Sequence, residues 1–361
     1  MNTPNEKNQS ASTAIVNSTF RDNVHFDAQV KETIKATFYG VPDANHAFVD
    51  RLDILMDMET SLKNFSTGEC KILALKGLGG IGKTQLMLHY CYIHSAEYEC
   101  VFWLEVSNWA MAVDSFRKLA INLGFDEDIT EEKDSEEKVI DWVRSWLQKK
   151  TKWLLLLDNA DDVMAKEVFK LLPCMGGHII LTTREPIPSS EATVIHVGKM
   201  KAEEAITLLL GGDLVEPAKI RHAQEIVSEL DCIPLAVDLA RAYVHNTLIS
   251  FRQYLHKLKT EYDTLLRYQH KDCSGQYDHT VATVWQISFQ SIRTQNPTAM
   301  QILEICAFLQ PDNIPVRLFE KQYSALQLVS TSLSANKEVV RQAIAVLVDF
   351  SFVIRTHKGI E

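Results

Sequence analysis

Eight consecutive residues, Gly77 to Thr84, have the types and spacing needed to hold a phosphate group. They read Gly-Leu-Gly-Gly-Ile-Gly-Lys-Thr and satisfy the pattern G-x-x-x-x-G-K-[ST]. Glycines let backbone N–H groups turn toward phosphate oxygens, the lysine reaches the outer phosphates, and the hydroxyl can ligate Mg²⁺. The nucleotide contacts predicted here are Gly77, Gly79, Gly80, Ile81, Gly82, Lys83, Thr84 and Gln85, with Lys83 also catalytic and Thr84 also a metal ligand.

A carboxylate that could complete a Mg²⁺ site follows the four leucines of Leu154 to Leu157. Such an apolar run predicts a buried strand, and Asp158 then stands at its end. Without the upstream loop, a strand-ending turn residue would be the better interpretation of Asp158. Because Asn159 follows it directly, Asp161 is the candidate general base and Asp162 the second choice, although both could equally cap the next helix.

A third candidate is Arg184, which follows the apolar run that begins at His178 and the hydroxyls of Thr182 and Thr183. Ligands of open α/β sheets bind at the carboxyl ends of the strands, so a guanidinium placed there could contact a γ-phosphate. Such charge-assisted hydrogen bonds contribute about 1.5–3 kcal/mol and would distinguish a triphosphate from a diphosphate. The alternative is an ordinary surface arginine at a strand end.

Strand and helix patterns alternate around these residues and predict an α/β fold with a parallel sheet covered on both faces by helices. The strands are expected at 71–76, 100–106, 153–157, 178–182 and 193–197, and the helices at 45–62, 109–123 and 136–149. The acidic stretch 126–137 is expected to be mainly a solvated loop, and residues 18–26 are a weak candidate for a strand.

Beyond Lys199 the pattern changes to successive helices. They are expected at 202–210, 217–230, 235–245, 251–266, 281–292, 297–309, 316–323 and 337–349, followed by a strand at 352–356. The predicted domains are a polar tail (1–40), a nucleotide-binding α/β domain (41–198), a helical bundle (199–270) and an incomplete winged helix (271–361).

Composition limits the classes of function. The 361 residues are 46% hydrophobic and carry a net charge of -10, which disfavours broad binding to nucleic acid or anionic membranes. The 7 cysteines are scattered without metal-binding spacing, and no signal peptide or membrane span is predicted, which favours a cytoplasmic protein. Basic and acidic residues balance from Asn296 onward, so binding of nucleic acid by the winged helix is not favoured.

The loop, Asp158 and Arg184, followed by Asp231-Cys-Ile-Pro-Leu-Ala236, resemble the NB-ARC domain of the signal-transduction ATPases over roughly residues 41 to 361. Those proteins are nucleotide-binding switches of intracellular immune receptors and apoptotic adaptors. The resemblance implies ATP or ADP with Mg²⁺, a sensor role for Arg184, and contacts of the base with Pro234 and Leu235. Pro234 is equally explained as the first-turn proline of a helix.

Phe48-Val-Asp-Arg51 is similar to the segment that lines the adenine pocket in this family, with Asp50 where glycine is usual. This implies contacts from Phe48 and Val49 and puts Asp50 and Arg51 in doubt. The aromatic pair in Val101 to Leu104 and the segments Val284 to Phe289 and Ala307 to Pro315 also resemble the family, particularly its fungal-type members.

The leading hypothesis is a regulatory switch that is closed with ADP, opens and self-associates with ATP, and hydrolyses ATP slowly. The resemblance implies an upstream effector and downstream repeats in a longer receptor, with roles such as innate immunity or programmed cell death. A Met-His-Asp-like segment is expected beyond Glu361. The alternatives are a nucleotide-gated winged-helix transcription regulator and, less favoured because so much of the chain is helical after Lys199, a P-loop phosphotransferase.

Overall fold

The computed structural model describes residues 37–63, 70–125, 135–161, 175–188, 190–211, 217–268, 276–309, 314–321, 337–353, 355 and 359–360. The chain divides into two compact units, with the boundary between Met200 and Lys201. The predicted subdivision of the second unit near residue 270 stays a prediction.

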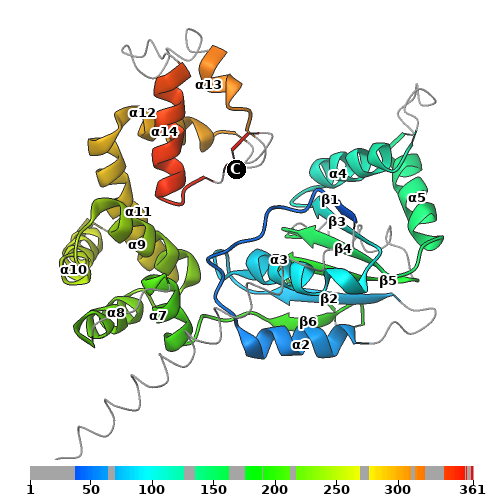
Figure 1. Cartoon of the computed structure of the whole chain (residues 1–361), viewed down its shortest axis with the longest axis horizontal. Coiled ribbons are helices and arrows are strands. Elements are labelled where there is room, and N and C mark those ends of the chain that lie inside the picture. Colours follow the sequence, from blue (N-terminus) through cyan, green and yellow to red (C-terminus); the bar gives the residue numbers. More distant parts are fainter. Residues whose placement is uncertain are drawn as a thin grey trace, which may run out of the picture. The chain divides into compact units, whose positions relative to one another are not determined.

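The first unit is built on a six-stranded parallel sheet (Figure 1). Its strands are β1 (Thr37–Tyr39), β2 (Lys71–Lys76), β3 (Cys100–Glu105), β4 (Trp153–Asp158), β5 (Gly177–Thr183) and β6 (Thr193–His196). They lie side by side in the order β1-β3-β4-β5-β2-β6. Since all the strands run the same way, their carboxyl ends meet at one edge, and this edge receives the side chains of the site.

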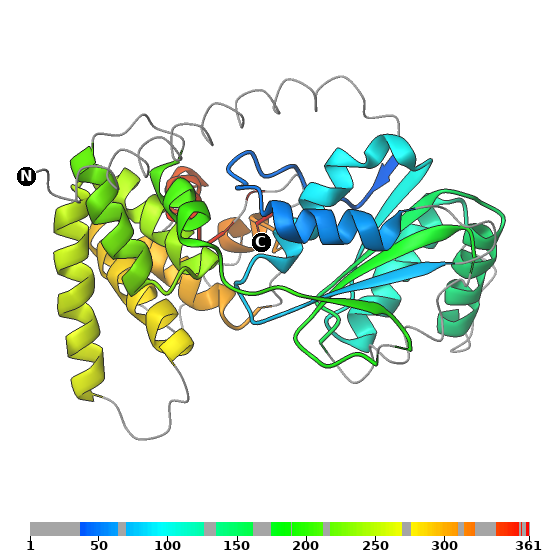
Figure 2. The same cartoon turned by 90° about the horizontal axis from the view of Figure 1, so that it is seen from below.

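The central strands β4 and β5 are buried along their whole length, which explains their continuous apolar sequences. Helices α2 (Leu52–Leu62) and α3 (Lys83–Ile93) pack on one face of the sheet through a core that includes Met58, Leu86 and Met87. Helices α4 (Trp109–Asn122) and α5 (Ser135–Gln148) pack on the other face through Phe116 and Val143 (Figures 1 and 2). The predicted α/β layering with helices on both faces is therefore confirmed.

Two local expectations differ from the structure. Thr37–Tyr39 lies in the segment predicted to be a polar tail, yet it forms β1 and pairs with Cys100, Val101 and Phe102 of β3. Three residues are too few to show the alternation of apolar and polar side chains that indicates a strand. Pairing with β3 therefore determines their conformation. The helix predicted over 45–62 begins only at Leu52, since Arg51 has a non-helical backbone with φ −107° and ψ 74°.

The second unit is helical in its described residues. Its helices are α7 (Ala202–Leu210), α8 (Pro217–Glu229), α9 (Pro234–Thr247), α10 (Phe251–Tyr268), α11 (Gln276–Gln295), α12 (Pro297–Cys306), α13 (Arg317–Lys321) and α14 (Lys337–Asp349). Isolated antiparallel bridges join Ile360 to Ile314 and Arg355. Of the strand predicted at 352–356, the described residues show pairing only at Arg355, because Ser351 with φ 59° and Phe352 turn the chain after α14. The winged-helix assignment stays a prediction.

Some predicted features lie outside the described residues. They are the candidate strand 18–26, Asp162, and residues 126–134 of the acidic stretch, whose last residues, Ser135 to Glu137, belong instead to α5. Across the described part of the chain, the helices are too short or too polar to span a membrane.

Candidate functional site

The phosphate loop connects β2 to α3 at the carboxyl edge of the sheet. Gly80 and Gly82 have φ values of 69° and 90°, in the left-handed region that favours glycine. Gly77 has a different constraint, since a Cβ there would lie 2.4 Å from the carbonyl oxygen of Val197. The glycines therefore permit both the turn and its close packing against the chain after β6.

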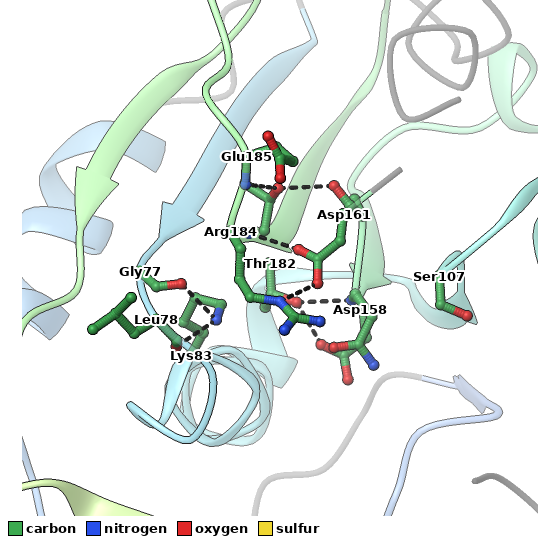
Figure 3. A network of polar contacts seen from close by, with 12 residues as sticks. Gly77, Leu78, Lys83, Ser107, Asp158, Asp161, Thr182, Arg184 and Glu185 are labelled. Carbon is green, nitrogen blue, oxygen red and sulfur yellow. Dashed lines mark hydrogen bonds and ion pairs between the residues drawn. The ribbon is translucent and has the colours of Figure 1, made fainter. Parts of the chain in front are cut away.

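Lys83 curls back over this loop. Its Nζ donates to the carbonyl oxygens of Gly77 at 3.0 Å and Leu78 at 2.9 Å (Figure 3). Burial lowers the pKa of Lys83, and the nearby charge of Arg184 lowers it further, while Asp161 and Asp158 oppose the shift. Two cations thus face the loop, and an anion bound between them would be stabilised by both.

Thr84 and Asp158 meet across the sheet edge, as the two predicted metal ligands must. Thr84 Oγ1 donates to Asp158 Oδ1 at 2.9 Å, and Thr182 Oγ1 donates to the same oxygen at 2.5 Å. Thr182 is fully buried and also accepts a hydrogen bond from the backbone N–H of Asn159 at 2.9 Å. The Asp158 carboxylate is therefore fixed in orientation by two hydroxyl groups.

This pair of oxygens fits a magnesium ion. Mg²⁺ binds six oxygens at about 2.0–2.1 Å in an octahedron, so neighbouring ligands lie about 2.9 Å apart. The Thr84 and Asp158 oxygens have this separation of 2.9 Å. Clusters of three or more His, Cys, Asp or Glu side chains suited to a metal are absent from the described residues. A threonine hydroxyl and a single carboxylate are donors of the kind that proteins use to bind Mg²⁺ together with substrate phosphates and water.

Arg184 follows β5 and is held by Asp161. Its backbone N–H donates to Asp161 Oδ1 and its Nε to Asp161 Oδ2, each at 2.6 Å (Figure 3). A Cβ placed on Gly79 would lie 3.9 Å from Arg184 Nη1, which puts the guanidinium beside the phosphate loop. Both carboxylate oxygens of Asp161 are thus engaged with Arg184, and this contact points to a positioning role for Asp161 more than to its predicted role as base.

Arg51, left in doubt by the sequence, binds protein carbonyl groups. Its side chain is buried and donates to the carbonyl oxygen of Ile81 at 3.2 Å. It also donates to those of Gly198 at 2.8 Å and Lys199 at 2.9 Å. The guanidinium therefore connects the start of α2, the phosphate loop and the segment after β6.

Phe48, Val49 and Asp50 lie just before α2. The Phe48 ring stacks on His89 of α3 with 4.1 Å between centroids, and Asp50 Oδ1 lies 3.1 Å from His89 Nε2. Asn45 Nδ2 donates to Gln85 Oε1 at 2.8 Å. The segment predicted to contact the base is thus fixed to α3, and Phe48 and Val49 are both partly buried there.

Pro234 and Leu235 begin α9 of the second unit, with Pro234 in the first turn. The helical explanation for Pro234 therefore holds, and its contact with the base stays a prediction, as does that of Leu235.

Four residues near the site were not predicted as functional: Thr182, Asn159, Glu105 and His89. The sequence could have indicated Thr182 and Asn159 as site residues, since both lie at the ends of predicted buried strands, as Asp158 does. Glu105 also ends a strand, but its pairing with Asp158 depends on which strands are neighbours. His89 gave no signal, because a histidine within a helix has no distinctive spacing.

Comparison with known proteins agrees with this geometry. Residues 56–211 match the NB-ARC domain family. The chain is 25% identical over 328 residues to a nucleotide-binding leucine-rich repeat (NLR)-like protein of Hyaloscypha variabilis, covering 80% of this chain and 32% of that protein. The chain therefore spans about a third of this relative.

A solved structure has the same fold. A Signal Transduction ATPase with Numerous Domains (STAND) protein with a tetratricopeptide repeat sensor, from Pyrococcus horikoshii, superposes with a TM-score of 0.50 at 14% identity, covering 91% of this chain and 42% of that one. Together with the loop, Asp158 and Arg184, these matches show that residues 56–211 are similar to the NB-ARC domain family and that the chain has the α/β fold of P-loop NTPases.

Proposed function

We propose that this chain is the ATP/ADP switch of a larger signalling protein. The observation that carries the proposal is the convergence of Lys83, Thr84, Asp158 and Arg184 at one edge of the sheet. Lys83 would bind the outer phosphate oxygens, and Thr84 and Asp158 would hold Mg²⁺. The ion, when bound, supplies charge neutralisation at the β- and γ-phosphates.

The switch itself would depend on Arg184. A ligand shifts a conformational equilibrium only by the difference in its affinity for the two states. A guanidinium fixed beside the loop by Asp161 would bind the γ-phosphate of ATP and find no such partner in ADP. ADP would hold the closed form, ATP would favour an open form that self-associates, and slow hydrolysis would reset it. An upstream effector, a downstream repeat sensor and a cytoplasmic location complete the proposal.

The test is to identify the nucleotide that the purified chain carries. The protein is denatured and the released small molecules are separated by chromatography, alongside Lys83→Ala and the control Lys118→Ala. Lys118 is an exposed residue of α4 paired with Asp114, so its loss removes the same charge away from the loop. We expect adenine nucleotide from the wild type and the control, and none from Lys83→Ala.

Thermal unfolding with added ATP or ADP provides a second measurement. Binding at a concentration 100 times the Kd stabilises the folded state by about 2.7 kcal/mol. The proposal is wrong if no nucleotide is released and neither ATP nor ADP raises the melting temperature of the wild type.

A further inference from the structure

The segment before α2 is attached along one side of helix α3. Gln85, His89 and Tyr92 are spaced at i, i+4 and i+7, so they lie on one face of that helix. Gln85 Oε1 accepts a hydrogen bond from Asn45 Nδ2 at 2.8 Å. The Tyr92 hydroxyl donates to the carbonyl oxygen of Pro42 at 2.8 Å. The chain before α2 is thus fixed to both the first and the last turn of α3.

His89 lies between these two contacts and holds the residues that follow. The Phe48 ring stacks on the His89 imidazole, with 4.1 Å between centroids and 24° between the planes. Asp50 Oδ1 lies 3.1 Å from His89 Nε2. The side chains of His89 and Asp50 are only 22% and 24% exposed, so water and salt screen their attraction less than on an open surface. One imidazole therefore fixes both an aromatic ring and a carboxylate of the same short segment.

The same segment borders the phosphate loop. Arg51 Nη1 donates to the carbonyl oxygen of Ile81 in the loop at 3.2 Å. Gln85, which Asn45 contacts, lies in the first turn of α3, directly after the loop. Residues 45–51 therefore touch the loop itself and the helical turn that follows it.

The order of the strands shows on which side of the loop this segment lies. The loop follows β2, and the strands with Arg184 and Asp158, β5 and β4, lie on one side of β2. Strand β6 lies on the other side, and Arg51 Nη2 donates to the carbonyl oxygens of Gly198 and Lys199 just after it. Helix α2 packs against β2 and β6 as well. The segment is therefore on the opposite side of the loop from the predicted magnesium ligand and the predicted sensor arginine.

This placement determines which part of a nucleotide faces the segment. In the proposed function, Mg²⁺ lies at the β- and γ-phosphates and Arg184 binds the γ-phosphate, so the outermost phosphate points toward β5 and β4. Because a triphosphate is an extended chain, its other end leaves the loop toward β6. The nucleoside at that end then meets Phe48 and Val49, which are both partly buried.

We propose that Asp50 and His89 act together as positioning residues for the nucleoside. They hold Phe48 and Val49 on α3, the helix whose amino-terminal end receives the phosphates, so one element sets the distance between the two parts of the site. This inference rests on the proposed function and adds how the nucleoside end of the site is fixed. A ligand with phosphates but no nucleoside should not depend on this pair.

Titration calorimetry of the full chain compares ATP, ADP and inorganic tripolyphosphate, each with Mg²⁺. Asp50→Ala and His89→Ala should each lower the affinity for ATP and ADP about tenfold, within the range for residues in direct contact, and leave the affinity for tripolyphosphate at the wild-type value. Because the two side chains act through one contact, the double variant should lose no more than His89→Ala alone. His89→Gln, whose amide can still donate to Asp50, should retain part of the affinity.

The matched control is Glu97→Ala, which removes a carboxylate 2.6 Å from His94 Nδ1 just beyond the other end of α3. It should bind all three ligands like the wild type. The inference is overturned if both single variants bind ATP and ADP normally, if their affinity for tripolyphosphate falls equally, or if the losses add in the double variant. It is also overturned if the wild type binds tripolyphosphate as tightly as ATP. A wild type that binds none of the three ligands would instead contradict the proposed switch, and this inference with it.

Discussion

Asp161 and Arg184 form an ion pair at the rim of the site. Replacing one carboxylate oxygen of Asp161 with an amide group tests this contact. Asp161→Asn leaves one acceptor oxygen in place of two. Arg184 can then no longer donate from both its Nε and its backbone N–H to residue 161. We expect ATP affinity to fall about tenfold, equivalent to 1.4 kcal/mol, while ADP affinity changes little. Titration calorimetry with each nucleotide measures the difference.

The control for this variant is Asp114→Asn, which breaks a surface ion pair with Lys118 on α4. Exposed pairs of this kind contribute little, so both affinities should match the wild type. Normal binding of ATP and ADP by Asp161→Asn combined with lost hydrolysis would contradict the positioning role. That result would favour Asp161 as the general base, the role that the sequence predicts for it.

At the scale of the elements, a buried histidine makes the stability of the sheet depend on pH. His178 near the start of β5 is 3% exposed, and its Nδ1 lies 2.8 Å from the Tyr98 hydroxyl. Burial, and secondarily Lys71, lowers the pKa of His178 to about 4. The unfolded chain, with a pKa near 6.5, takes up the proton first. Stability is therefore complete above pH 6.5 and falls as the pH drops toward 4, by on the order of 3 kcal/mol.

Urea unfolding across this range measures the effect. His178→Gln should be less stable at neutral pH, because it disturbs the contact with Tyr98, but its stability should fall less between pH 6.5 and 4. His196→Gln provides the control, since this residue is exposed at the end of β6. An unchanged pH dependence in His178→Gln would show that another group is responsible.

The sequence predicted the strands β2 to β6 closely because each is a short apolar run between polar or glycine-containing turns. It missed β1, since Thr37–Tyr39 becomes a strand only through its pairing with β3. The phosphate loop and Asp158 were identifiable from local chemistry alone. The partners of Arg51, Asp161 and Glu105 were not, because each depends on which distant segments become neighbours in the sheet.

At the scale of the whole molecule, the resemblance predicts that the base contacts Pro234 at the start of α9. Pro234→Ala should keep the helix, because alanine is favourable in a helical turn. If the predicted contact forms, affinity for both ATP and ADP should fall about tenfold, or 1.4 kcal/mol. Equilibrium binding of a fluorescent ADP analogue, with ATP and ADP as competitors, measures the change.

Pro297→Ala is the control, since Pro297 begins α12 in the same way within the same unit. Its nucleotide affinity should equal that of the wild type, and both variants should retain the helical content seen by circular dichroism. Wild-type affinity in Pro234→Ala would leave Pro234 with its helical role alone.

The contacts of Arg51 also determine how late in synthesis the phosphate loop can be held in its folded arrangement. The loop Gly77–Thr84 leaves the ribosome early, yet β6 pairs with β2, and Arg51 needs the carbonyls of Gly198 and Lys199. At about 5–20 residues per second, the roughly 115 residues in between take about 6–23 s to translate. During that interval the nascent chain contains the whole octapeptide without the strand and carbonyls that hold it. Competence to bind a nucleotide therefore arises late, after the last strand of the sheet has been made.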